Sequence, residues 1–513
     1  MCPTFAKSDV RQPTENISSP PPHHIIKKNK GVGSQRTENQ MSEIIKAEEQ
    51  PKSHKQSLGA QQEALGTKPL GKLLMEYALP SIIAMTATSL YNMADSIFIG
   101  QGDGRLGLTG LTVCFPLMNL SAAFGAMVGI GAASTIAVRL GQREVESAEN
   151  AMGNVILLNV LIGTLFAVTS LLFLDPILTF FGASADSLPY ARSYMEVLLY
   201  GNVLTHLYLG LNDCVRSSGY PRRAMAATLT AVVVNVLLDY VFIVQMGMGI
   251  RGAALATVLA QAVALCVVLS HLLGKESILH FHRRIFHWRW RTVRAIVSVG
   301  CAPFFVNLGA CLVVLIINNS LAQHGGDSYI GAYGIVNRVA FIFIMVTQGI
   351  NQGMQPIASF NYGAGAYGRS VRIYKVAAVV ATIIMTFSFV VCEGVPNFII
   401  SWFNPDEEMK AIAVHAMRIM VAIFPLVGFQ IITVGFLTAL GQAHKAIVLS
   451  LSRQIICLVP LLLILPDHFG TDGVWYSMPI SDAIAVFVAA LLGISQVRIL
   501  SKKQNSQSQK NVN

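Results

Sequence analysis

The chain has 513 residues, of which 53% are hydrophobic and only 12% charged, and it carries a formal net charge of +10. Soluble domains carry about 25% charged residues, so this composition excludes an ordinary soluble protein and indicates a multi-pass membrane protein. The apolar runs do not alternate with polar residues, which excludes a β-barrel. Most Lys and Arg lie in the N-terminal tail or in loops on one predicted side of the membrane. The charge therefore indicates orientation in a lipid bilayer, and no nucleic-acid partner is expected.

The first segment of the chain, residues 1–66, is polar and rich in Ser, Gln, Lys, Glu and Pro. This composition cannot bury enough apolar surface to fold, and it is typical of disorder. The segment contains no pattern of a cleavable signal peptide. We expect a disordered N-terminal tail and assign no function to it.

Apolar stretches long enough to cross a bilayer follow the tail, separated by Gly, Pro or charged residues. They predict an all-α integral membrane protein with twelve transmembrane helices. Each stretch is interpreted as one span. The predicted spans are 72–99, 106–138, 150–174, 188–215, 223–246, 250–273, 294–322, 328–360, 372–398, 409–438, 445–465 and 472–499.

The loops between these spans differ strongly in charge. With the N-terminus placed in the cytosol, the outer loops contain only Arg105, Arg192, Arg251 and Lys410, whereas the inner loops contain most of the other basic residues. Basic loops stay on the cytosolic side. We therefore predict a multi-pass protein of the cell (plasma or inner) membrane with both termini in the cytoplasm.

The spans form an internal repeat. Gly131 and Gly353 are 222 positions apart, and Pro80 and Pro303 are 223 apart. Six spans per repeat give both halves the same orientation, so the halves should be related by an axis along the membrane normal. The predicted organisation is a tail (1–66), an N-lobe (67–273), a cytosolic basic linker (274–293), a C-lobe (294–499) and a C-terminal tail (500–513).

The linker 274–293 is basic and aromatic, which is typical of a segment at the membrane interface. Its three histidines, His280, His282 and His287, offer an alternative interpretation as a metal site. The interfacial interpretation is favoured because the aromatic and basic residues around the histidines explain their presence without a metal.

Asn235 and Asp239 lie four residues apart within an apolar span, so on a helix they share one face. A carboxylate at membrane depth costs roughly 3 kcal/mol, which makes it a candidate functional residue. A helix rises about 1.5 Å per residue. By this measure Asp95, near the outer end of the first span, lies at a membrane depth similar to that of Asn235 and Asp239. Thr257, just below the outer start of the sixth span, lies at a similar depth.

Two buried carboxylates that lie close together share a proton or hold a cation. Asp95 and Asp239 with their oxygen-bearing neighbours thus predict a site for a small cation. A purely structural polar network is the alternative. The repeat places Asn318, Cys457 and Leu461 at the C-lobe positions of Asp95, Asn235 and Asp239, so the site is predicted in the N-lobe alone. The charged residues within C-lobe spans are expected to pair with each other or with backbone carbonyls; they are Arg338, Arg418, Arg453 and Asp482.

Four motifs connect the chain to a known family: LYNMADSIFIG, NVLLDYVFI, GMGIRGAALATVLAQ and NQGMQPIASFNYGAG. In combination they resemble the multidrug and toxic compound extrusion (MATE) family, most closely its bacterial-type branch with an acidic site in the N-lobe. The resemblance covers about residues 70–500. It implies a V-shaped pair of six-helix bundles with a cavity between them, and export of organic cations and other amphipathic drugs by alternating access.

The resemblance also implies roles for single residues. The family's cation-coupling site falls on Asp95, Asn235, Asp239 and Thr257, which would bind Na⁺ if the transporter is sodium-coupled. A tyrosine of that network falls on Tyr194, and the proline at which the first span bends falls on Pro80. We expect a monomer that transports H⁺ or Na⁺ and has no cofactor.

Three other functions are less consistent with the sequence. A lipid-linked oligosaccharide flippase would have more spans and a strongly cationic cavity. An ion channel would have little need of two lobes with an asymmetric acidic site, and the sequence contains no motif of a selectivity filter. An enzyme is not expected because the sequence contains no nucleophile elbow, HExxH motif or phosphate-binding loop. The residues leave the choice between H⁺ and Na⁺ open, since both suit oxygen ligands.

Overall fold

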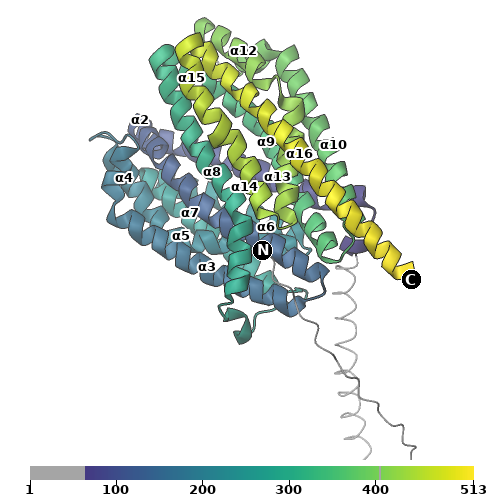
Figure 1. Ribbon diagram of the computed structural model, residues 1–513. Coiled ribbons are helices and arrows are strands. Elements are labelled where there is room, and N and C mark those ends of the chain that lie inside the picture. The colour runs from purple at the N-terminus through teal and green to yellow at the C-terminus, as the bar shows by residue number, and fades with distance from the viewer. Residues whose placement is uncertain (1–63, 404–405, 513) are drawn as a thin grey trace, which may run out of the picture. The chain divides into compact units, whose positions relative to one another are not determined.

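The computed structural model describes residues 64–403 and 406–512, and these are helical with no strand (Figure 1). The predicted tail 1–66 lies outside the described residues up to residue 63. An α-helical membrane fold follows from the composition, because a helix satisfies every backbone hydrogen bond internally in lipid. The all-helical fold is thereby confirmed.

The N-lobe consists of five long helices and two short elements, and Figure 1 shows it in purple to teal. Its elements are α2 (Leu70–Gly141), α3 (Val145–Leu172), α4 (Leu174–Phe180), α5 (Leu188–Ser217), α6 (Pro221–Asp239), the π-helical turn η1 (Tyr240–Gln245) and α7 (Gly249–Leu273).

The C-lobe repeats this pattern with more interruptions. Its elements, after the short 3₁₀ turn η2 (Arg283–Phe286), are α8 (Trp290–His324), α9 (Asp327–Gly363), α10 (Tyr367–Gly394), α11 (Pro396–Ser401), α12 (Glu407–Val421), α13 (Phe424–Ala439), α14 (Ala443–Leu451), the π-helical turn η3 (Ser452–Leu458), α15 (Val459–Phe469) and α16 (Thr471–Val512).

Helix α2 contains the first two predicted spans. Its 72 residues would extend over about 108 Å, far more than the roughly 30 Å of a bilayer core. The break comes at Gly104, where φ is 60° and ψ is −142°, a conformation that strongly favours glycine. The neighbouring Asp103 accepts a hydrogen bond from the backbone N–H of Ile250, and so caps the first turn of α7. This break coincides with the predicted loop between spans one and two.

The described residues contain nine helices long and apolar enough to cross a membrane, or ten if α12 and α13, bent by 53°, form one span. Helix α2 is long enough to cross twice, and α5, although less apolar, has 30 residues. The elements therefore accommodate all twelve predicted spans. The count of twelve crossings itself stays a prediction.

The two lobes meet along α2, which packs against α8 and α9. A Cβ atom at Gly131 would overlap the carbonyl of Ile296, and one at Gly353 would overlap the backbone of Ala78. These two repeat-related glycines therefore allow backbone to approach backbone between the lobes. Ser134 adds hydrogen bonds across the interface, because its hydroxyl donates to the carbonyl of Thr438 at 3.0 Å.

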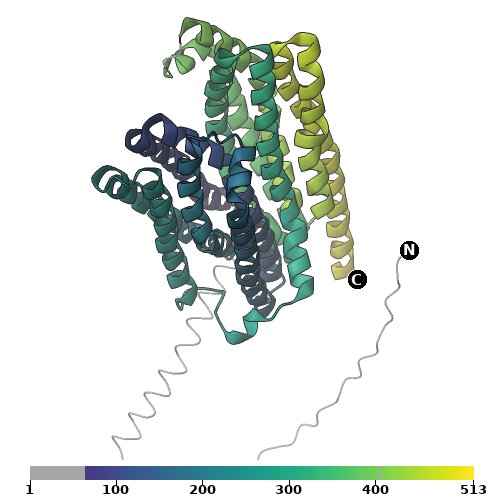
Figure 2. The ribbon, with the colours of Figure 1, turned by 90° about the vertical axis from the view of Figure 1, so that its left-hand side faces the viewer.

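The linker and the C-terminus lie at the same end of the bundle, which we call the linker end (Figures 1 and 2). The charge distribution predicts that this end is cytosolic. The lobes are in contact here: Gly141, at the linker end of α2, approaches the carbonyl of Phe360, and Gly363, at the linker end of α9, approaches that of Val138. The structure thus has its linker end closed.

The linker is docked on α3 of the N-lobe. Ile285 is fully buried, and Glu149 of α3 accepts a hydrogen bond from the backbone N–H of His280 and lies 3.2 Å from Nε2 of His282. Within the described residues, no group of three or more His, Cys, Asp and Glu side chains is arranged to hold a metal. The alternative metal interpretation of the linker histidines therefore finds no support.

The predicted C-terminal tail continues the last span as a helix. Helix α16 extends to Val512. Beyond the predicted span, Gln504 accepts a hydrogen bond from the backbone N–H of Gly368, and Lys503 lies over the ring of Tyr367. The end of the chain is thereby attached to the connection between α9 and α10.

Candidate cation site and inter-lobe cavity

The predicted site residues come from four helices of the N-lobe. Asp95 lies on α2, Tyr194 on α5, Asn235 and Asp239 on α6, and Thr257 on α7. All five are buried, and Asp239 is fully buried. The sequence explains this placement locally, since the four-residue spacing puts Asn235 and Asp239 on one face of α6.

The five side chains lie together. The amide of Asn235 donates to Oγ1 of Thr257 at 3.3 Å. The hydroxyl of Tyr194 lies near the carboxylate of Asp95. The carboxylates of Asp95 and Asp239 are close enough to interact electrostatically. The structure brings these residues together, and their role as cation ligands stays a prediction.

Several oxygens of this cluster lack a donor. Oδ1 of Asp95, Oδ1 of Asn235 and both carboxylate oxygens of Asp239 are buried and accept no hydrogen bond from any described residue. Buried polar atoms in proteins nearly always have a partner, so such a group requires an explanation. A set of acceptors without donors suits a proton, or a hard cation such as Na⁺ that takes oxygen ligands.

Two features of the backbone position this cluster. Helix α6 changes to the π-helical turn η1 directly after Asp239, whereas the sequence had predicted one regular span over 223–246. Such turns inside α-helices are frequently found at functional sites. On α7, the cap by Asp103 at Ile250 holds the start of the helix that carries Thr257.

Pro80 lies inside α2, fifteen residues before Asp95, and is buried. Proline removes one helix hydrogen bond, which makes the position easy to bend. The non-helical backbone of α2 is found at Gly104 and not at Pro80. A bend at Pro80 therefore stays a prediction for another conformation.

The equivalent region of the C-lobe holds an ion pair. Nε of Arg453 lies 2.6 Å from Oδ1 of Asp482, and the hydroxyl of Ser481 donates to the carbonyl of Arg453. Arg418 lies 3.7 Å from Glu393, and Arg338 is exposed. Among the described residues, the buried carboxylates without an ion-pair partner, those of Asp95 and Asp239, lie in the N-lobe.

A cavity of about 530 Å³ lies between the lobes, lined by residues of α2, α5, α6, α7, α8, α9 and α13. Asn235 and Thr257 line this cavity and also belong to the candidate cation site. We call that site, formed by Asp95, Tyr194, Asn235, Asp239 and Thr257, the cation cluster. A change in the cation cluster therefore also changes the cavity. The cavity is large enough for a drug-sized molecule, since such sites typically measure about 300–1,000 Å³.

The sequence had missed two residues of this cavity. Asp213 lies near the end of the fourth predicted span, 188–215, and Arg216 lies in the basic loop that follows it, so neither is expected from the sequence to line a cavity. In the structure, both line the cavity, together with amide side chains of α9 such as Gln352. The amides of the motif NQGMQ were a usable signal, because neutral polar residues inside a span require partners or a cavity.

Comparisons with known proteins agree with this architecture. The MatE family model matches residues 80–241 and again 303–464, one match in each lobe. The multidrug export protein MepA of Staphylococcus haemolyticus is 24% identical over 421 residues, which cover 82% of this chain and 92% of MepA. MepA of Staphylococcus aureus strain NCTC 8325 is 23% identical over 428 residues, which cover 83% and 93%.

Solved structures share the fold. A MATE protein in the bent conformation superposes with a TM-score of 0.81 at 24% identity, covering 87% of this chain and 99% of that one. A MOP superfamily transporter from Pyrococcus furiosus gives 0.80 at 24% identity, covering 85% and 98%. The two family matches together span more than half of the chain, one in each lobe of a membrane fold with a central cavity. The chain therefore belongs to the MATE family of membrane transporters.

Proposed function

We propose that this protein is a secondary active exporter of organic cations and other amphipathic drugs, driven by antiport of H⁺ or Na⁺. The observation that carries this proposal is the group of buried oxygens without donors on Asp95, Asn235 and Asp239 beside the cavity. The names of the MepA relatives, which are multidrug export proteins, support export of varied compounds. The predicted setting is the cell membrane, with both termini in the cytoplasm and the protein a monomer.

Cation binding is coupled to drug release because the cation cluster and the cavity share residues. A monovalent cation that binds at Asp95 and Asp239 offsets one of their two negative charges and so relieves the repulsion between the carboxylates. Because Asn235 and Thr257 also line the cavity, the rearrangement reaches the drug. A ligand shifts a conformational equilibrium only by its differential affinity for the two states. The cation must therefore bind more tightly to the conformation that releases the drug, and a bend of α2 at Pro80 would change the cavity wall.

Of the competing functions, the flippase is disfavoured by the cavity itself. Among the described residues that line it, one is acidic and one is basic, which differs from a strongly cationic cavity. The channel has no structural observation in its favour.

The test uses the purified protein in vesicles with a fluorescent organic cation such as ethidium. A pH gradient and a Na⁺ gradient are imposed separately. We expect ethidium transport with one of the two gradients, and none after Asp239→Asn. Steady unitary currents would instead indicate a channel, and normal transport by Asp239→Asn would show that the site assignment is wrong.

A further inference from the structure

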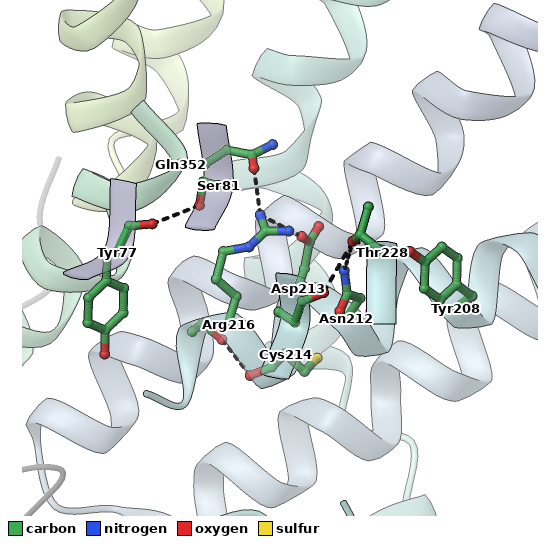
Figure 3. A network of polar contacts seen from close by, with 11 residues as sticks. Tyr77, Ser81, Tyr208, Asn212, Asp213, Cys214, Arg216, Thr228 and Gln352 are labelled. Carbon is green, nitrogen blue, oxygen red and sulfur yellow. Dashed lines mark hydrogen bonds and ion pairs between the residues drawn. The ribbon is translucent and has the colours of Figure 1, made fainter. Parts of the chain in front are cut away.

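The floor of the cavity contains a charged network that joins the lobes. Asp213 and Arg216 lie one turn apart on α5, with Nη1 of Arg216 3.1 Å from Oδ1 of Asp213. The same Nη1 donates to Oε1 of Gln352 on α9 at 2.9 Å. Figure 3 shows Arg216 between these two partners. An arginine of the N-lobe is thus held by one residue of its own helix and one residue of the opposite lobe.

This network provides the charged side chains that a substrate in the cavity would meet. Asp213 and Arg216 are the only charged residues among the described side chains that line the cavity, and both also line a smaller pocket beside Ser134. Their side chains are only 17% and 16% exposed. The cavity wall therefore carries no net charge from these residues, and Arg216 covers its one acidic side chain.

The surroundings of Asp213 favour a cation. Gly129 of α2 leaves the space that Oδ2 of Asp213 occupies. The amides of Asn212 and Asn351 line the same cavity, and their Oδ1 atoms are buried and accept no hydrogen bond from any described residue. Nδ2 of Asn212 donates a hydrogen bond to Oγ1 of Thr228 at 3.2 Å, so only the amide oxygen of Asn212 lacks a partner. The carboxylate of Asp213 and the amide oxygens of Asn212 and Asn351 thus line one cavity as acceptors, which suits a positively charged ligand.

We propose that Asp213 is the counter-ion of the exported organic cation, and that Gln352 controls its availability by holding Arg216 against it when the linker end is closed. This inference rests on the proposed export function and deepens it. When the lobes separate at the linker end, Gln352 moves away with α9. Arg216 then loses one of its two anchors and regains side-chain freedom, which leaves Asp213 accessible to a cation from the cytosol.

This arrangement gives an exporter the difference in affinity that it needs. A drug must bind well when the cavity faces the cytosol and poorly when it faces outward. With the linker end closed, the drug competes with Arg216 for Asp213, because the hydrogen bond to Gln352 keeps the guanidinium in place. With the linker end open, that competition is weaker.

The test measures binding of two probes of similar size to the purified full-length protein in nanodiscs. Tetraphenylphosphonium is a permanent cation, and triphenylphosphine oxide is neutral. We expect Gln352→Ala to increase the affinity for tetraphenylphosphonium roughly tenfold, which corresponds to about 1.4 kcal/mol, and to leave the neutral probe unchanged. Asp213→Asn should weaken binding of the cation selectively. Retained binding of the neutral probe shows that each variant is folded.

A matched control and a double variant complete the design. Gln355 lines the same cavity from the same helix, and its side chain makes no hydrogen bond to a described residue, so Gln355→Ala should not change the ratio of the two affinities. In Asp213→Asn/Gln352→Ala the tenfold gain should disappear. If the gain persists there, Gln352 acts only on the conformational equilibrium and the counter-ion assignment is wrong. If the unchanged protein binds and exports no organic cation, the proposed function itself fails.

Discussion

The two lobes descend from one repeated pattern but treat buried charge in opposite ways. In the N-lobe, Asp95 and Asp239 lie close together with oxygens that no described residue satisfies. In the C-lobe, Asp482 is paired with Arg453 at 2.6 Å. A paired charge needs no further ligand, whereas an unpaired carboxylate in the membrane requires a proton or a cation. Under the proposed function, the N-lobe binds and releases the ion while the C-lobe provides a stable frame.

The largest difference should appear between two variants that each remove one carboxylate, one variant in the N-lobe and the other in the C-lobe. We expect Asp239→Asn to abolish gradient-driven export completely, because one carboxylate of the cation cluster is lost. Asp482→Asn in the C-lobe should retain most of the export. Initial rates of ethidium export from vesicles, at matched protein density, measure both. If both variants lost coupling equally, the contrast between the lobes would be wrong.

The next effect concerns the interface that the lobes share. A Cβ atom at Gly353 would overlap the backbone of Ala78, and backbone cannot move aside as a flexible side chain does. Overpacking of this kind costs about 1–3 kcal/mol, so Gly353→Ala should favour separation of the lobes at the linker end and slow export about tenfold. Export rates of the variant in vesicles are the measurement.

Gly334 provides the matched control for this variant. It lies on the same helix, α9, and a Cβ atom there would meet no other atom within 4 Å. Gly334→Ala should export at the normal rate. Equal slowing in both variants would point to altered helix flexibility instead of contact between the lobes.

A smaller effect is expected from the ion pair of the C-lobe. Asp482→Leu leaves Arg453, which is 28% exposed, without its carboxylate, and should lower the free energy of unfolding by about 1–3 kcal/mol. The double variant Arg453→Met/Asp482→Leu should recover much of this loss, because it removes the second charge as well. Thermal unfolding of the detergent-purified protein measures both. A double variant as unstable as the single one would contradict a purely structural role of the pair.

The smallest effect is expected at the cap of α7 in the N-lobe. Asp103→Ala removes the acceptor of the Ile250 N–H and should cost about 1 kcal/mol, seen as a lower melting temperature. Asp103→Asn keeps an acceptor oxygen and should be nearly as stable as the original protein. Equal melting temperatures of the two variants would show that the cap contributes nothing to stability.

Much of the fold could be predicted because its determinants are local. The break at Gly104 follows from a cluster of glycine and charge, and the closeness of Asn235 and Asp239 follows from helix periodicity. The π-helical turn after Asp239 could not be predicted, since it depends on how α6 packs and not on its apolar pattern. The docking of Ile285 of the linker on α3 was missed for the same reason.

The sequence by itself determined the class of the protein and the repeat, because hydropathy, spacing and recurrence are properties of the chain. Spacing and depth also predicted Asp95, Asn235, Asp239 and Thr257 as a candidate cation site. Only the tertiary structure decided which charges are partnered. Asp213 and Arg216 looked like ordinary charges near a span end until α9 brought Gln352 beside them. Gln352 lies 136 positions from Arg216 along the chain, and no local pattern carries information over that separation.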